Sequence, residues 1–153
     1  MKIVDLKTDN RKDNNNVGRA IPVFGWRAEG TERNIRQKSY RLQVWKTESP
    51  EEILAEPFPV WDSGTVCSSS MANIPYEGKK LDSGSRYRWQ VECTLDYEDG
   101  EKNTTEEAWF ETGLFSMDDW KGCFIGETED HVYHLYRKAF TCERTVCLRA
   151  GAF

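Results

Sequence analysis

The segment from Arg86 to Asp96 alternates polar and apolar residues at every position, and this pattern constrains the fold more than any other feature of the sequence. Its apolar members share one parity: Tyr87, Trp89, Val91, Cys93 and Leu95. Successive side chains of a β-strand point to opposite faces of the sheet, so a period of two places all five on one face. The segment therefore predicts a strand with one buried and one solvated face.

Shorter runs of the same kind recur over the first 112 residues, where helical periodicity is scarce. They predict strands at Lys2–Leu6, Ile21–Glu29, Ser39–Thr47, Val60–Ser68 and Glu106–Thr112. In these runs the inward parity holds Tyr40, Leu42, Val44, Ala108 and Phe110. The Asp-Gly pair within Glu98–Glu101 predicts a hairpin turn. Short strands at regular spacing with turns between them predict an all-β fold, an antiparallel sandwich of two sheets.

The chain of 153 residues divides into three parts by pattern. We expect an N-terminal strand and polar loop at 1–16, the sandwich at 17–113, and a linker with the incomplete start of a second β-domain at 114–153. The linker predicts one helical turn capped by Ser116. After it, strand-like runs at Lys121–Gly126, Val132–Thr141 and Thr145–Ala150 predict a short β-rich extension, too small for a core of its own.

Composition excludes several classes of function. There are 21 basic against 26 acidic residues, a net charge of −5, which leaves no electrostatic footprint for nucleic acid or an anionic membrane surface. No apolar run approaches the ~20 residues that span a bilayer. The first ten residues lack the apolar core of a signal peptide, so we expect a cytoplasmic chain whose five cysteines are free thiols.

No pattern of residues predicts a catalytic, cofactor or metal site. Residues 92–111 hold eight acids and one lysine, which we interpret as a solvated hairpin rather than an acid/base pair or a calcium site at Asp96, Asp99 and Glu101. The candidate zinc ligands are Cys123, His131, His134 and Cys142. Their spacing fits no usual zinc pattern, and strand positions i and i+3 diverge, so we reject that site.

Three tryptophans are candidate glycan contacts, because outward parity turns flat rings to solvent: Trp45, Trp61 and Trp109. A sugar stacks its C–H face on such a ring, and nearby carboxylates or amides hold its hydroxyls. The alternative places these rings in the core or between domains, since large aromatic residues dominate both settings. We favour the alternative.

The segment Leu81–Val91 resembles the fibronectin type III pattern, in which a leucine precedes by six residues the tyrosine that opens an alternating strand. In this sequence they are Leu81 and Tyr87. The physical basis is a tyrosine corner, whose ring packs inward while its hydroxyl bonds to backbone near the preceding turn.

A longer run of motifs resembles the amino-terminal region of bacterial α-L-rhamnosidases of glycoside hydrolase family 78. The matching pieces, in order, are residues 22–26 (PVFGW), 37–44 (QKSYRLQV), 60–66 (VWDSGTV), 76–81 (YEGKKL), 87–91 (YRWQV), 109–114 (WFETGL) and 119–120 (DW). Their order over about 100 residues carries the resemblance. It continues weakly through residues 136–140, which look like the first strand pair of the family's next β-domain.

The resemblance implies an immunoglobulin- or fibronectin-type-III-like sandwich that works as a non-catalytic accessory module, truncated or split before the family's (α/α) catalytic barrel. None of the family's catalytic acids has a matching position here. The module would pack against and orient neighbouring modules. Two alternatives remain: a stand-alone domain that binds rhamnose-containing glycans, and a protein-interaction module that forms homo-oligomers through its C-terminal strands.

Overall fold

A computed structural model of the chain describes residues 2–12, 15–30, 35–47, 58–98, 100–123, 137 and 139. Its strands are β1 (Lys2–Thr8), β2 (Val23–Glu29), β3 (Arg36–Lys46), β4 (Trp61–Asp62), β5 (Ile74–Pro75), β6 (Arg86–Tyr97) and β7 (Gly100–Glu111). A short 3₁₀ helix, η1 (Met117–Asp119), follows β7. Within these ranges no helix is long and apolar enough to cross a bilayer.

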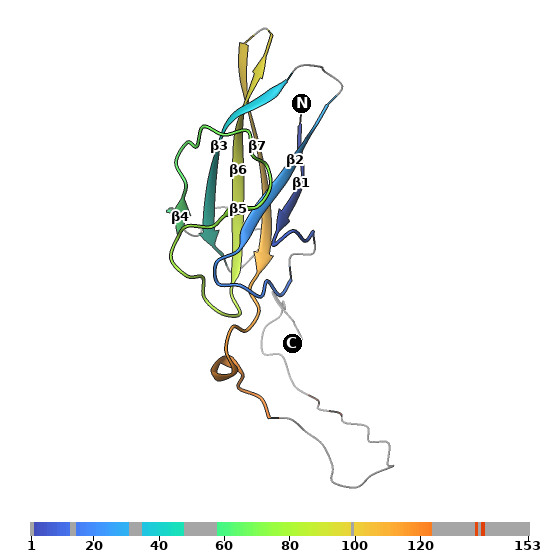
Figure 1. Ribbon diagram of the computed structural model, residues 1–153. Coiled ribbons are helices and arrows are strands. Elements are labelled where there is room, and N and C mark those ends of the chain that lie inside the picture. Colours follow the sequence, from blue (N-terminus) through green and yellow to red (C-terminus); the bar gives the residue numbers. More distant parts are fainter. Residues whose placement is uncertain are drawn as a thin grey trace.

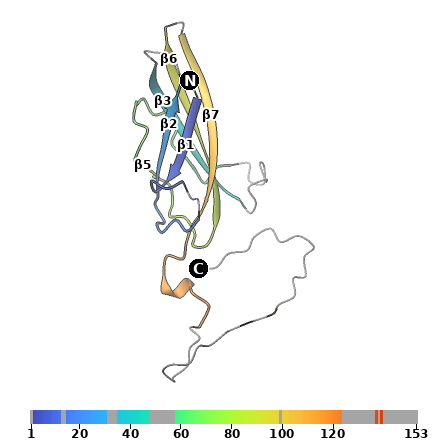
Figure 2. The same ribbon diagram turned by 90° about the vertical axis from the view of Figure 1, so that its right-hand side faces the viewer.

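The strands form two antiparallel sheets, one of three strands in the order β1-β2-β5 and one of four in the order β4-β3-β6-β7. The sheets pack face to face, and β1 also lies beside β7 at one edge (Figures 1 and 2). The chain leaves the sandwich at the end opposite the β6–β7 hairpin tip (Figure 1). The predicted all-β, immunoglobulin- or fibronectin-type-III-like sandwich is confirmed.

The predicted inward stripe of β6 is the centre of the core. Its five apolar residues are at most 2% exposed, and Leu42 and Val44 of β3 beside it are fully buried. Phe24 of β2 reaches across from the other sheet, with its ring centroid 4.7 Å from that of Trp89. The alternation in the sequence therefore places the apolar residues between the two sheets, as expected.

One predicted strand, Val60–Ser68, is wrong in extent. Only Trp61–Asp62 pair with β3, and the chain meets it again in an isolated bridge between Tyr40 and Val66. Gly64 lies between these contacts at φ +62°, a left-handed conformation that extended strands do not adopt. The glycine turns the chain out of the sheet after two residues.

Two strands differ from the sequence prediction in other ways. β7 begins at Gly100 rather than Glu106, because its first half pairs with β6 through the backbone while its side chains are mostly exposed. β5 has only two residues, one of them Pro75, and gives no periodic signal. The predicted β-rich extension lies outside the described residues, apart from positions 121–123, 137 and 139.

The predicted tyrosine corner is present. Leu81 is buried, and the Tyr87 hydroxyl accepts a hydrogen bond of 2.8 Å from the backbone N–H of Asp82. Burial raises the pKa of Tyr87, so the hydroxyl stays neutral. The corner fixes the turn that precedes β6 to the strand itself.

We expect Tyr87→Phe to destabilise the chain by about 1–3 kcal/mol, because it leaves the Asp82 N–H without its partner. Tyr76→Phe is the matched control. The Tyr76 hydroxyl is buried without a hydrogen-bond partner among the described residues, so its removal should be neutral or stabilising. Urea unfolding midpoints measure both, and equal losses in the two variants would contradict the corner's role.

We expect Gly78→Ala to destabilise the chain by about 1–3 kcal/mol through overpacking. A Cβ at this position would overlap the Tyr76 hydroxyl and lie 2.9 Å from Cβ of Trp61. At Gly18 a Cβ meets nothing within 4 Å, so Gly18→Ala is the control for loss of glycine alone. Thermal unfolding compares the two, and a stable Gly78→Ala variant would show that the Tyr76 ring can move.

Candidate functional site

The described structure offers two surfaces for function: the end where the chain leaves the sandwich, and the outer face of the four-stranded sheet. At the exit, the residues after β7 are tied to two separate loops. Gly113 N–H donates to the Val17 carbonyl at 2.9 Å, and Gly84 N–H donates to the Gly113 carbonyl at 3.0 Å. The Thr112 hydroxyl donates to the Asp82 carbonyl at 2.7 Å. The first residues beyond β7 are thus held from both sides.

The helix η1 adds a further attachment to the loop that holds Gly84, made by Asp119. Ser116 caps η1 as expected, with a capping box completed by the Asp119 side chain. Oδ2 of Asp119 also accepts from Ser83 Oγ at 2.8 Å and from the backbone N–H groups of Ser116 and Phe115 at 3.0 and 3.2 Å. We call this arrangement the exit lock, defined by Ser83, Ser116 and Asp119.

The hydrogen bonds of the exit lock favour the charged form of the Asp119 carboxyl. The hydrogen bond from Ser83, followed by those from the Ser116 and Phe115 backbone, lowers the pKa of Asp119 from its ordinary value. The lock is therefore formed at neutral pH. It weakens as pH falls through that lowered pKa, because a protonated carboxyl is a poorer acceptor.

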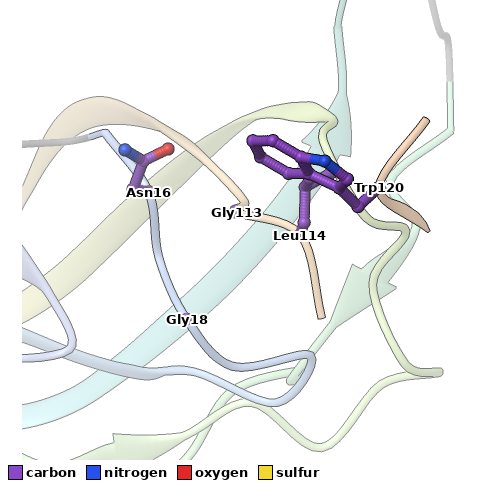
Figure 3. Close-up of a pocket in the computed structure, with 5 residues that line it drawn as sticks. All are labelled: Asn16, Gly18, Gly113, Leu114 and Trp120. Carbon is purple, nitrogen blue, oxygen red and sulfur yellow. The ribbon is translucent and has the colours of Figure 1, made fainter. Parts of the chain in front are cut away.

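Beside the lock lies an open hollow of about 310 Å³. Asn16 and Gly18, from the segment before β2, line one side, and Leu114 and Trp120 of the exit segment line the other (Figure 3). The two segments that line the hollow also carry exposed apolar residues, Met117 of the exit segment at 75% exposure and Ile21, between Gly18 and β2, at 47%. The exit thus presents apolar surface next to a firmly attached chain segment.

Val60, 43% exposed, extends this surface on the side of the Tyr87 turn. It lines a second hollow of about 360 Å³ together with Lys46, Tyr76, Leu81 and Asp82. Lys46 donates to the Asp82 carboxylate at 2.7 Å across its rim. This hollow therefore belongs to the same end of the sandwich as the exit lock.

The outer face of the four-stranded sheet carries two of the three candidate tryptophans. Backbone pairing aligns Trp45 of β3 with Arg88 of β6, and Arg88 with Trp109 of β7. The Arg88 guanidinium lies 4.5 Å from the centroid of the Trp45 ring, and that of Arg86 lies 5.2 Å from the Trp109 ring. Both distances suit cation–π attraction. We call these four residues the Trp–Arg row.

The third tryptophan, Trp61, packs with the core instead. Its ring centroid is 5.0 Å from that of Tyr76 and 6.4 Å from that of Phe24, with which it stacks. The register of β4 explains the difference, because Trp61 pairs with Val44 of β3, whose side chain is fully buried, and directly opposed residues share one face of a sheet. The structure does not bring Trp61 together with Trp45 and Trp109.

Acidic side chains of the β6–β7 hairpin are engaged in cross-strand pairs. Glu107 accepts from Arg88 at 2.8 Å, Glu111 from Arg86 at 2.7 Å, and Glu101 from Lys38. Among the described residues no group of three His, Cys, Asp or Glu side chains could hold a metal ion. His131, His134 and Cys142 lie outside those residues. The sequence did not reveal the exit lock, because Ser83 and Asp119 are 36 positions apart.

Comparison with known proteins identifies the relatives of this chain. The family described as the Rha78A-like, N-terminal immunoglobulin domain matches residues 3–116. An α-L-rhamnosidase from Alteromonas sp. (strain LOR) is 33% identical over 108 residues, and one from Formosa agariphila is 36% identical over 107 residues. Each alignment covers 70% of this chain but only 11% of the relative, so the chain spans about a tenth of their length.

Solved structures give the same result. α-L-rhamnosidase from Dictyoglumus thermophilum matches 79% of this chain and 13% of its own, with 31% identity and a TM-score of 0.65. That from Streptomyces avermitilis, solved in complex with L-rhamnose, matches 78% and 11%, with 25% identity and a TM-score of 0.66. The chain therefore belongs to the Rha78A-like N-terminal immunoglobulin domain family, and it matches the amino-terminal domain of α-L-rhamnosidases but not their catalytic region.

Proposed function

We propose that the chain is the non-catalytic, amino-terminal accessory module of an α-L-rhamnosidase-like protein of glycoside hydrolase family 78, and that it orients the module that follows. The family match and the small share of each relative that it covers support an accessory role. The orienting role rests on the exit lock. A chain segment tied to the sandwich at Val17, Ser83 and Gly84 leaves it in one direction.

The lock matters because a flexible linker could not transmit orientation. A linker without such contacts samples many directions, and each ordered backbone residue costs roughly 1–2 kcal/mol in lost entropy. Here the hydrogen bonds of Thr112, Gly113 and Asp119 offset that cost before any neighbour is present. The apolar surface around Ile21, Met117 and Trp120 lies where the next module would meet the sandwich.

We expect Asp119→Asn and Ser83→Ala to release the exit segment without unfolding the sandwich. The amide protons of Phe115 and Ser116, which both point at Asp119, should then exchange faster by hydrogen-exchange NMR at pH 7. In the unaltered chain the same protection should fade as pH falls through the lowered pKa of Asp119, and Asp119→Asn should lose this dependence.

Asp118→Asn is the matched control. It removes the same charge one residue away in the same helix η1, from an exposed position whose side chain takes no part in the lock. Its exchange rates should equal those of the unaltered chain. Fast exchange at Phe115 and Ser116 already in the unaltered chain would remove the basis of the orienting role.

We expect the purified chain to leave a nitrophenyl α-L-rhamnoside uncleaved, because it matches only the amino-terminal domain of the enzymes. Glu111 and Glu107 of β7 are paired with Arg86 and Arg88, so they do not form the free pair of carboxyl groups that a glycosidase needs. Release of nitrophenolate is followed by absorbance against a chain-free blank. Turnover that co-purifies with the chain and disappears on changing one of its carboxylates would overturn the non-catalytic assignment.

A second candidate function is contact with rhamnose-containing glycans, and the Trp–Arg row favours it. Trp45 and Trp109 lie on the outer face of the sheet, away from the core cluster that holds Trp61. L-rhamnose is the sugar bound in the solved Streptomyces avermitilis relative, so it is the natural probe. This function is compatible with the first, since the row and the exit are separate surfaces.

We also propose a cytoplasmic location and reduced cysteines for the chain. The supporting observation is Cys93, a free thiol at the centre of the core, where burial raises its pKa to about 12 and makes it an inert small apolar group. Homo-oligomers through the C-terminal strands stay a prediction, because those strands lie outside the described residues.

A further inference from the structure

The Trp–Arg row combines half-buried indole rings with cations that are largely covered. The Arg86 and Arg88 side chains keep 10% and 15% of their surface exposed, and Trp45 and Trp109 are half-buried. Each guanidinium lies over one face of an indole ring. The row therefore offers indole surface to a ligand, with a guanidinium held against each ring.

The charges of the row are cancelled locally. Glu111 pairs with Arg86 and Glu107 pairs with Arg88. On the neighbouring strands Arg41 and Asp62 form a two-bond pair, with N–O distances of 2.9 and 2.6 Å. A face whose cations and anions are matched in this way gives no net attraction for an ionic ligand, so it suits a neutral one.

Amide groups lie next to the tryptophans. Gln43 of β3 and Gln90 of β6 are paired in register, two residues along from Trp45 and Arg88 and on the same face. That offset is about 7 Å along the strand. The Gln90 side chain makes no hydrogen bond to any described residue, and it carries two N–H donors and a carbonyl acceptor. Sugar hydroxyls need this combination.

The spacing of the rings sets the length of the ligand. Trp45 and Trp109 lie in one row on β3 and β7 with a single strand between them, which separates their backbones by about 10 Å. A disaccharide is about as long as this separation of the two strands, whereas a single pyranose ring is shorter. Two consecutive sugar residues can each stack on one.

We propose that the Trp–Arg row, with Gln43 and Gln90, is a binding site for a neutral oligosaccharide of at least two residues. The C–H faces of the sugars stack on Trp45 and Trp109, and hydroxyl groups bond to the Gln90 amide and to the Gln43 amide, which also donates to Asp62 at 3.0 Å. The site rests on the second function proposed above and names its residues and ligand class. A protein partner fits less well, because the large apolar side chains that are exposed among the described residues all lie outside β3, β6 and β7: Ile21, Phe58, Val60 and Met117.

The test is an NMR titration of the whole chain with a methyl α-L-rhamnoside and with a rhamnose disaccharide. We expect saturable shifts of the Trp45 and Trp109 indole N–H signals and of the Gln90 side-chain amide, and tighter binding of the disaccharide. Trp45→Ala and Trp109→Ala should each weaken it about tenfold. Arg27→Ala, at an exposed position on the other sheet, should bind like the unaltered chain.

Gln90→Ala provides a variant outside the cation–π contacts, so its fold should be unchanged while its affinity falls. Each failure has its own signature. No saturable binding by the unaltered chain would remove the glycan function and the site together. Binding that keeps its affinity in the Trp45, Trp109 and Gln90 variants would leave the function standing and overturn the site. A sedimentation mass that rises with concentration and falls in the tryptophan variants would make the row an interface between copies.

Discussion

The contact between Phe24 and Trp89 joins the two sheets, and the rest of the structure depends on it. Phe24 comes from the three-stranded sheet and Trp89 from the four-stranded sheet, both are at most 1% exposed, and their ring centroids are 4.7 Å apart. Burying a large apolar side chain contributes about 1.5–3 kcal/mol, and aromatic pairs add to this. A register slip of one residue in β6 would turn Trp89 to solvent and bring Arg88 inward. The core therefore also fixes the outer face.

A continuous set of hydrogen bonds links this core to the exit. Tyr87, two residues before Trp89, holds the backbone of Asp82, and the Asp82 carbonyl accepts from the Thr112 hydroxyl. One residue further, Ser83 holds Asp119 in the exit segment. The tyrosine corner is thus more than a device for closing a turn. It places the loop that holds the departing chain, so the direction of exit is set by the packing of β6.

Those elements whose cause is local were predictable from sequence. Three such signals are contained in a few consecutive residues each: the alternation of β6, the inward face of β3, and the leucine–tyrosine spacing of the corner. The extent of β7 was not, since polar side chains occupy both parities from Gly100 to Thr105 and only backbone pairing defines the strand. Trp45 faces outward as parity predicts, whereas Trp61 faces the core, because its partner in register is the buried Val44.

The position of a buried polar residue is also hard to predict when its partners are distant in the sequence. Gln37 is 4% exposed, accepts from the Trp26 indole N–H, and donates to the Ser68 and Ser70 carbonyls, all at 3.0 Å. Partners 31 and 33 positions away leave no local trace in the sequence. An irregularity between Gln37 and Ser39 also shifts the parity of β3, so an alternation rule misplaces Gln37. The Ser83–Asp119 hydrogen bond could not be predicted either, because its partners are far apart in the sequence. The cap that Ser116 makes could be predicted, because its partners are neighbours.

The two candidate surfaces differ in chemistry, and the difference argues for two kinds of occupant. The exit end exposes flexible or branched apolar side chains such as Met117 and Ile21, which suit packing against another protein surface. The outer face carries half-buried indole rings beside paired charges and the Gln90 amide, and this combination suits a ligand that alternates C–H with O–H groups. Because β6 supplies Tyr87 to one surface and Arg88 to the other, a single strand register holds both in place.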